Sequence, residues 1–427
     1  MKENDNLKNS ILKSKTIKKL FKKTNKKVKK RNTFLNKDDK IDKQNNNKNI
    51  DSNIKNEPKI TKKQRDPSVD FLRLLCMYGT IVHHELNVGQ GFKKYSRYRR
   101  YLNAFNAIFF WHINGFALIS GIVGYKSSKY SNLLYLWLCV YFYSVGFHIY
   151  FSKFRQNSIV KDSISVEYFP MIFRRYWYFT RYFGMYLFLP VVNKGISLLS
   201  KSELKLVVIT TLGIFVFWKD YKNPKEDIFY LRGGWNTLWF LIFYITGAYI
   251  GKYRVEYIGI KKFIFCIICL LIFLSTTYLY FKAINNELGF IKGYYKRKII
   301  MFLNRFINEN YNSLNKIIQS ISIALFILQI KFNKYLAKII CFHGRVAFGI
   351  YMVHVNLLVA KNSIEKIFKY DSTNLTLNET IILFLTKALK IFFICIFIDY
   401  LKFLLFTLLR IRNICIFLEK MAFKILG

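Results

Sequence analysis

Acidic residues are scarce in this sequence: 24 aspartates and glutamates stand against 68 lysines and arginines, a formal net charge of +44. A basic excess of this size suits nucleic acid or an anionic lipid surface as a partner. About a third of the excess lies in residues 1–66, which are rich in Lys and Asn. We expect 1–66 to be a disordered tail attracted to acidic lipid headgroups, with no nucleic-acid partner. An overall bias toward Lys, Asn and Ile is the alternative explanation.

Cysteines are few, and they lack the spacing of a metal site. Cys266 and Cys269 form a C-x-x-C pair inside the continuous apolar run FIFCIICLLIF, without further Cys or His at ligand spacing. We interpret this pair as structural and expect no metal. The N-terminal region also lacks the apolar core of a cleavable signal peptide, so the first membrane helix is expected to act as the targeting signal.

Long apolar runs dominate the rest of the chain, in which 52% of all residues are hydrophobic and 18% aromatic. Stretches of about 17 to 20 residues with few charges can cross a hydrocarbon core about 30 Å thick. About ten such segments are predicted, and tilt and helix packing compensate for the short ones. They are 71–88, 104–125, 133–151, 176–192, 204–218, 237–250, 263–281, 317–330, 346–360 and 381–409. Pro190 is expected to bend or end the fourth helix.

The predicted fold is therefore all-α: a polytopic membrane protein with a bundle of about ten transmembrane helices. The bundle is assigned to residues 67–410, followed by a short basic C-terminal segment at 411–427. An even number of spans places both termini on one side of the membrane, and the basic tail favours the cytoplasmic side.

The first apolar segment, DFLRLLCMYGTIVHHELN, carries the most distinctive polar residues. Arg73 and His84 are eleven positions apart, which corresponds to about three helical turns, so they share one face about 16 Å apart along the axis. His83 points about 100° away from that face. Solvated caps at the two ends of a core helix would explain the same pattern.

Five motifs in this chain resemble, in order, those of the acyltransferase-3 family of integral membrane proteins. They are VDFLRLLCMYGTIVHH, INGFALISGIVGY, YWYFTRYFGMYLFLPVVN, WNTLWFLIFYITGAYIGKY and FGIYMVH, and the resemblance extends from Ser68 to about Leu409. The family moves an acyl group, commonly acetyl from acetyl-CoA, onto hydroxyl groups of extracytoplasmic carbohydrates or related acceptors. Its first helix carries an Arg or Lys and a His with ten residues between them, which corresponds to Arg73 and His84.

The resemblance implies that His84 is the catalytic base, because a neutral imidazole can take the proton of an acceptor hydroxyl. Arg73 is then expected to act with it as a site cation that binds the phosphates of CoA, since a guanidinium keeps its charge and binds oxygens in pairs. Pairing of Arg73 with Asp70, or anchoring of Arg73 at the membrane surface, is the alternative.

Further residues in these motifs are candidates for the same site. Arg181 lies inside an apolar span and is a second candidate for contact with phosphate or sugar. Trp235 and Asn236 are candidates for stacking on and hydrogen bonding to a sugar, although membrane anchoring also explains the tryptophan. Tyr351 and His354 are expected to complete the polar site.

Other polar residues of the membrane segments receive structural or supporting roles. Gly121 allows close helix approach, beside Ser120, and His112 and Asn114 are expected to line a polar cavity without taking part in catalysis. Lys387, Lys390 and Asp399 are expected to pair with each other or to reach the membrane surface.

The resemblance implies a membrane-bound O-acyltransferase without a permanently bound cofactor, for which acetyl-CoA or another acyl-CoA is the donor substrate. The expected partners are this donor, a carbohydrate or glycolipid acceptor, and membrane lipids. A polytopic transporter with an ionisable translocation path is the alternative, as is an inactive scaffold of the same fold. Matched helices broken by Gly or Pro, which would favour a transporter, are not found.

Overall fold

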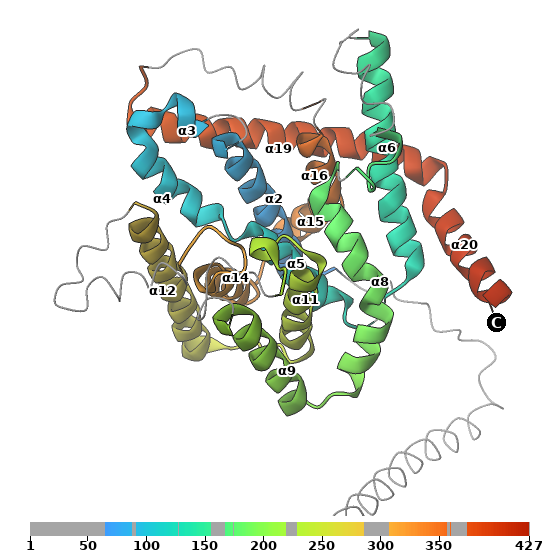
Figure 1. The fold of residues 1–427 in the computed structure, drawn as a ribbon, viewed down its shortest axis with the longest axis horizontal. Helices are drawn as coiled ribbons and strands as arrows, with labels where there is room; N and C mark the ends of the chain where they lie inside the picture. Colours follow the sequence, from blue (N-terminus) through green and yellow to red (C-terminus); the bar gives the residue numbers. More distant parts are fainter. Residues whose placement is uncertain are drawn as a thin grey trace, which may run out of the picture. The chain divides into compact units, whose positions relative to one another are not determined.

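A computed structural model describes residues 65–87, 91–126, 128–154, 167–173, 175–218, 229–285, 307–356, 359 and 374–426. The chain divides into two units, Met1–Gln64 and Arg65–Gly427, and only the second contains described residues. Every regular element in those residues is a helix (Figure 1), which confirms the all-α prediction for them. The predicted disordered tail, apart from its last two residues, lies outside the described part of the chain.

Each of the ten predicted apolar segments contains helix. The chain forms α2 (Pro67–Asn87), α3 (Gly91–Lys94), η1 (Ser96–Tyr98), α4 (Arg99–Phe109), α5 (His112–Gly124), α6 (Tyr130–Phe154), α8 (Trp177–Leu198), α9 (Lys201–Gly213), η3 (Ile214–Trp218), η4 (Arg232–Gly234), α11 (Thr237–Lys252), α12 (Gly259–Ile284), α14 (Leu314–Ile327), α15 (Lys334–Gly344), α16 (Ala347–Val355), α19 (Leu377–Leu408) and α20 (Ile411–Leu426). Helix α15 is absent from the sequence-based prediction, and α20 occupies the segment predicted only as basic.

Four helices in the described residues are long and apolar enough to cross a membrane. They are Ser96–Gly124, Tyr130–Lys153, Gly259–Ile284 and Leu377–Leu408. Helices α15 and α16 meet at an angle of 43° and add a fifth if the bent pair is one span. The predicted count of about ten spans is therefore not confirmed, because the other helices are too short or too polar to qualify by themselves.

Pro190 was predicted to bend or to end helix α8, and the helix does not end there. The helix runs on to Leu198. Asn193 lies in the turn after the proline, donates a hydrogen bond to the Gly124 carbonyl at 3.0 Å and accepts one from the Tyr244 hydroxyl at 2.8 Å. These bonds to two other helices hold the turn that follows the proline, although the proline has no N–H to donate.

Helix α2 lies at the centre of the helices that surround the site. Asp66 caps its first turn by accepting hydrogen bonds from the Ser68 and Val69 N–H groups at 2.9 and 3.4 Å, and Pro67 occupies the first helical position, where no N–H is needed. Helices α4, α5, α14, α15, α16 and α19 all pack against α2 (Figure 1). Polar side chains on α2 are therefore held inside the protein.

Helices α5 and α11 pack with their backbones in direct contact, as predicted for Gly121. A Cβ atom added at Gly121 would lie 1.9 Å from the Tyr244 carbonyl oxygen, and one added at Gly247 would lie 2.0 Å from the Leu118 carbonyl oxygen. Glycine at both positions thus permits an approach that any side chain would prevent. The contact holds α11 against the part of α5 that lines the site.

Helix α19 carries a buried ion pair that links it to α6. The carboxylate of Asp399, only 1% exposed, lies 2.8 Å from the Lys402 ammonium and accepts a hydrogen bond from the Tyr143 hydroxyl at 2.5 Å. The sequence predicted a pair between Asp399 and Lys387 or Lys390, whereas in the structure Asp399 pairs with Lys402, one turn away. A charge at this depth is tolerated because it is both neutralised and hydrogen-bonded.

The glycine contact predicts a large difference between two otherwise similar substitutions. Gly247→Ala should lower stability by about 1–3 kcal/mol or more, because the new methyl group overlaps a backbone carbonyl. Gly146→Ala in α6 should be neutral or stabilising, because a Cβ there meets nothing within 4 Å and alanine favours a helix. Thermal unfolding in detergent is the measurement; equal melting temperatures for the two variants would contradict the packing.

Candidate active site

A cavity of about 450 Å³ opens between α2, α5, α6, α8, α11 and α16. From α2 it is lined by Arg73, Met77, Thr80 and His84, which recur at the spacing of one helix face. The two residues selected from the sequence thus line the same cavity at its two ends. Its size lies within the range of small-molecule sites.

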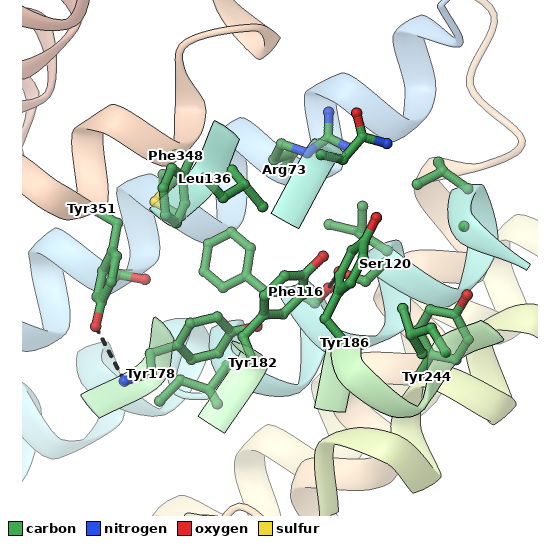
Figure 2. Close-up of a pocket in the computed structure, with 18 of the residues that line it drawn as sticks. Arg73, Phe116, Ser120, Leu136, Tyr178, Tyr182, Tyr186, Tyr244, Phe348 and Tyr351 are labelled. Carbon is green, nitrogen blue, oxygen red and sulfur yellow. Dashed lines mark hydrogen bonds between the residues drawn. The ribbon is translucent and has the colours of Figure 1, made fainter. Parts of the chain in front are cut away.

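Tyrosines form one wall of this cavity. Tyr178, Tyr182 and Tyr186 recur every four residues along α8, and Tyr351 from α16 and Tyr244 from α11 extend the row. Figure 2 shows these five rings following one another across the view. The wall therefore offers aromatic surface together with a few hydroxyl groups.

A hydrogen bond joins two of these tyrosines at the start of α8. The Tyr351 hydroxyl oxygen accepts a hydrogen bond from the Tyr178 backbone N–H at 3.2 Å (Figure 2), which satisfies one of the free N–H groups of the first helical turn. The Tyr178 hydroxyl is buried and has no hydrogen-bond partner among the described residues. The Tyr178 ring, rather than its enclosed hydroxyl, therefore forms this part of the cavity wall.

His84 is held by His354 of α16. Nδ1 of His84 lies 3.2 Å from Nε2 of His354, and Nδ1 of His354 lies 2.6 Å from the Ile350 carbonyl oxygen. Because a carbonyl can only accept, the neutral His354 ring carries its proton on Nδ1 and accepts through Nε2. His84 must then donate from Nδ1, which leaves the lone pair of its Nε2 free to take a proton.

Arg73 lines the opposite end of the cavity beside a shared carboxylate. Asp70 accepts hydrogen bonds from Arg73 Nη1 and, at 2.6 and 2.5 Å, from two nitrogens of Arg65. The alternative pairing of Arg73 with Asp70 is thus present. One carboxylate between two guanidinium groups leaves a net positive charge, and the remaining N–H groups of Arg73 can still bind an anion.

His83 faces the other side of α2 and does not line the cavity. Its Nδ1 lies 3.0 Å from the Asn106 amide oxygen, and its ring contacts Phe110 and His112 at centroid distances of 4.6 and 5.3 Å. His112 is buried, with Nδ1 2.9 Å from the Phe109 carbonyl, and it also lies outside the cavity lining. The adjacent histidines of α2 therefore have separate surroundings.

Asn114 and Asn236, both considered from sequence, have their amide groups occupied by the protein. Asn114 donates to the Tyr311 carbonyl at 2.8 Å and accepts from the Trp239 indole at 3.0 Å. Asn236 caps α11 by accepting from the Trp239 N–H at 2.8 Å and donates to the Tyr230 carbonyl at 2.8 Å. Neither residue lines the cavity.

Trp235 and Arg181 lie next to cavity-lining residues without lining the cavity themselves. Trp235 is 42% exposed and packs on the cavity residue Trp177 with ring centroids 4.3 Å apart. Arg181 lies between Tyr178 and Tyr182 on α8, and its carbonyl accepts a hydrogen bond from Thr237 at 3.3 Å. The structure therefore brings together Arg73, His84, Tyr351 and His354, with Trp235 behind the His84 end.

A buried lysine escaped the sequence analysis. Lys316 of α14 has 0% exposure, and its ammonium lies 3.3 Å from the centre of the Tyr280 ring and 4.5 Å from that of Phe110. Such contacts stabilise a cation electrostatically. In the sequence, a buried lysine near the start of an apolar run looks the same as a lysine that reaches the membrane surface. Only its inward-facing position in the structure identifies Lys316 as buried.

The sequence of this chain also matches a known protein family. A family model described as an acyltransferase domain matches residues 66–401, most of the chain and all of the cavity lining. The chain belongs to the acyltransferase-3 family. No curated protein and no solved structure shows significant similarity to it.

Membership of the acyltransferase-3 family gives the cavity a reaction class. The family and the apolar helices together indicate an integral membrane transferase. In the described part of this acyltransferase, no group of three or more His, Cys, Asp or Glu side chains is placed to hold a metal ion. The groups on the cavity wall include an imidazole with a free lone pair and a guanidinium, beside a row of tyrosine rings.

The His84–His354 hydrogen bond predicts that His354 fixes the orientation and tautomer of His84, the candidate base. His354→Ala should lower the turnover of acyl transfer, because His84 can then rotate or adopt the other tautomer. His354→Gln should restore part of the rate, since its amide oxygen can accept the same bond. Turnover and acceptor KM of the purified variants are the measurement, and equal losses in both variants would contradict a role through tautomer control.

Proposed function

We propose that this protein transfers an acyl group, in the simplest case acetyl, from acyl-CoA to a hydroxyl group of a carbohydrate or glycolipid acceptor. The observation that carries the proposal is the position of His84, which lines the cavity and is held by His354 in the tautomer that leaves Nε2 unprotonated. A base of this kind is what attack by a weakly nucleophilic hydroxyl requires.

The chemistry needs one proton transfer in each direction. Nε2 of His84 takes the proton of the acceptor hydroxyl as the oxygen forms its bond to the thioester carbonyl carbon. The C–S bond of the resulting intermediate then breaks, and the departing thiolate takes the proton from Nε2. The ester and free CoA are formed, and His84 returns to its starting state.

The tyrosine wall contributes binding and polarity near His84. The Tyr178 ring lines the cavity with Tyr351, and its aromatic surface can pack against the donor arm or the acceptor. Tyr351 keeps Tyr178 in place through the bond to its backbone N–H. The other walls are largely apolar, which limits the access of water and with it competing hydrolysis.

The two ends of the cavity suit two different substrates. Arg73 supplies positive charge at one end, which favours the phosphates of CoA. Trp177 lines the other end and packs against the half-exposed Trp235, so a sugar acceptor can approach over aromatic surface there. We assign the Arg73 end to the cytoplasmic side, where acyl-CoA and both termini of the chain would lie, and the Trp235 end to the opposite side.

His84→Ala tests the proposed base directly. In membranes supplied with radiolabelled acetyl-CoA, this substitution should reduce label transfer on the order of 10²- to 10⁴-fold, the usual contribution of a positioned base. His83→Ala is the matched control, because His83 lies one residue away and does not line the cavity. The proposal is wrong if the His84 variant, at equal protein level, transfers label as fast as the His83 variant does.

Arg73→Ala tests the proposed contact with the donor. A hydrogen bond to a charged group contributes about 1.5–3 kcal/mol, so the KM for acetyl-CoA should rise about 10- to 100-fold. Arg65→Ala is the control, because Arg65 binds the same carboxylate as Arg73 but does not line the cavity. Equal effects of both substitutions would mean that Arg73 serves only to hold Asp70.

A further inference from the structure

A second cavity of about 360 Å³ lies between the beginning of α6 and the C-terminal helix α20. Ser128, Lys129 and Tyr130 line it from one side, and Glu419, Lys420 and Phe423 from the other. We call it the α20 groove. No residue of α20 belongs to the matched family region, which ends at residue 401.

The α20 groove adjoins the catalytic cavity, because the two share a lining residue. Ser128 lines both of them. Tyr186, the last tyrosine of the α8 row, lines the catalytic cavity and donates a hydrogen bond from its hydroxyl to the Lys129 carbonyl at 3.1 Å. A molecule bound in the groove therefore lies beside the cavity that Arg73 and His84 line.

The side chains of the groove match the parts of a nucleotide. Lys129 and Lys420 present exposed ammonium groups to phosphates. Tyr130 and Phe423, 41% and 60% exposed, offer ring faces on which a purine can stack. Glu419 supplies a carboxylate that can accept hydrogen bonds from a ribose hydroxyl or an adenine amino group.

The opposite face of α20 explains how the helix keeps this position. Ile414, Phe417, Met421 and Ile425 are exposed on it, whereas Cys415 is buried and α20 packs against α6. An amphipathic helix with basic residues on one side and such an apolar face lies along a membrane surface. The α20 groove then faces the water from which a soluble donor arrives.

We propose that the α20 groove binds the 3′-phospho-ADP part of the acyl-CoA donor while its pantetheine arm reaches through the cavity to His84. This inference rests on the proposed function, since it assumes a CoA thioester as donor. Lys129 and Lys420 bind the 3′-phosphate and the phosphate next to the ribose, and Tyr130 and Phe423 hold the adenine. Arg73 binds the phosphate that carries the pantetheine arm.

Another cavity at the same end of α2 is a weaker candidate for this nucleotide. It is lined by Asp66, Arg254 and Gln329 among others, and shares no residue with the lining of the catalytic cavity. Arg254 already binds the Asp66 carboxylate and, at 2.5 Å, the Leu328 carbonyl. Its charge is therefore used within the protein.

A comparison of two donor substrates distinguishes binding of the nucleotide from the acyl-transfer reaction. Acetyl-CoA carries 3′-phospho-ADP, whereas acetyl-pantetheine has the same thioester without it. In the double variant Lys129→Gln/Lys420→Gln, the KM for acetyl-CoA should rise more than tenfold. Each lost ion pair between an exposed lysine and a phosphate accounts for about fivefold of this rise. The KM for acetyl-pantetheine should stay at the wild-type value. Phe423→Ala should show the same selectivity for the longer donor.

Lys424→Gln is the matched control, because Lys424 lies on the same helix with the same charge but does not line the groove. It should leave the KM for both donors unchanged. The groove is not the nucleotide site if the double lysine variant changes both donors equally, or neither. A wild-type protein that transfers acetyl from neither donor would refute the proposed function itself, and the groove assignment with it.

Discussion

An apolar surrounding offers no hydrogen bonds, so buried polar side chains on α2 need partners inside the protein. Most of them have one, whereas the buried carboxylate of Glu85 has no hydrogen-bond partner among the described residues. This constraint explains the arrangement around the helix. Asp70 binds two guanidinium groups, His83 contacts Asn106, and His84 bonds to His354. Six other helices enclose α2. Helix α5 packs closely against α11, and the catalytic cavity lies on only one face of α2.

Pairing inside the protein also decides which groups are left to react. Asn114 and Asn236 use both ends of their amide groups on other protein atoms, so they strengthen the scaffold. His84 and Arg73 line the cavity, and within the described residues each is hydrogen-bonded through only one nitrogen, to His354 and to Asp70 respectively. Unused hydrogen-bonding capacity that faces the cavity therefore distinguishes candidate site residues from structural ones better than residue type does.

Helical periodicity explains how much of this site the sequence could predict. Arg73 and His84 share a face because eleven residues make about three turns, and the tyrosines of α8 share one because they are four residues apart. Each of the apolar runs contains helix, since composition determines that much. The number of spans was not recoverable, because short or polar helices such as α2 satisfy no simple length rule.

The rest of the site depends on contacts between distant parts of the chain. His84 and His354 are 270 residues apart, and no periodicity relates two positions on different helices. Trp235 and Asn236 were predicted to contact a sugar together, but the asparagine caps α11 and the tryptophan lies behind Trp177. The α20 groove requires the start of α6 beside a helix that follows the last long span, a pairing that composition does not specify.

The geometry of α2 finally explains why one helix can serve two substrates of opposite character. A phosphate-bearing donor needs a fixed positive charge, whereas a hydroxyl acceptor needs a neutral base. These two requirements conflict if the two groups are adjacent, because a nearby cation disfavours proton uptake by an imidazole. Three helical turns place Arg73 and His84 about 16 Å apart along the axis, which makes their Coulomb interaction about fourfold weaker than that of a pair about 4 Å apart. The apolar residue Met77 and the hydroxyl of Thr80, which is bonded to the Cys76 carbonyl at 2.8 Å, line the cavity between them. A long, narrow thioester arm can span that interval, so the proposed function places charge recognition and proton transfer at opposite ends of one helix face.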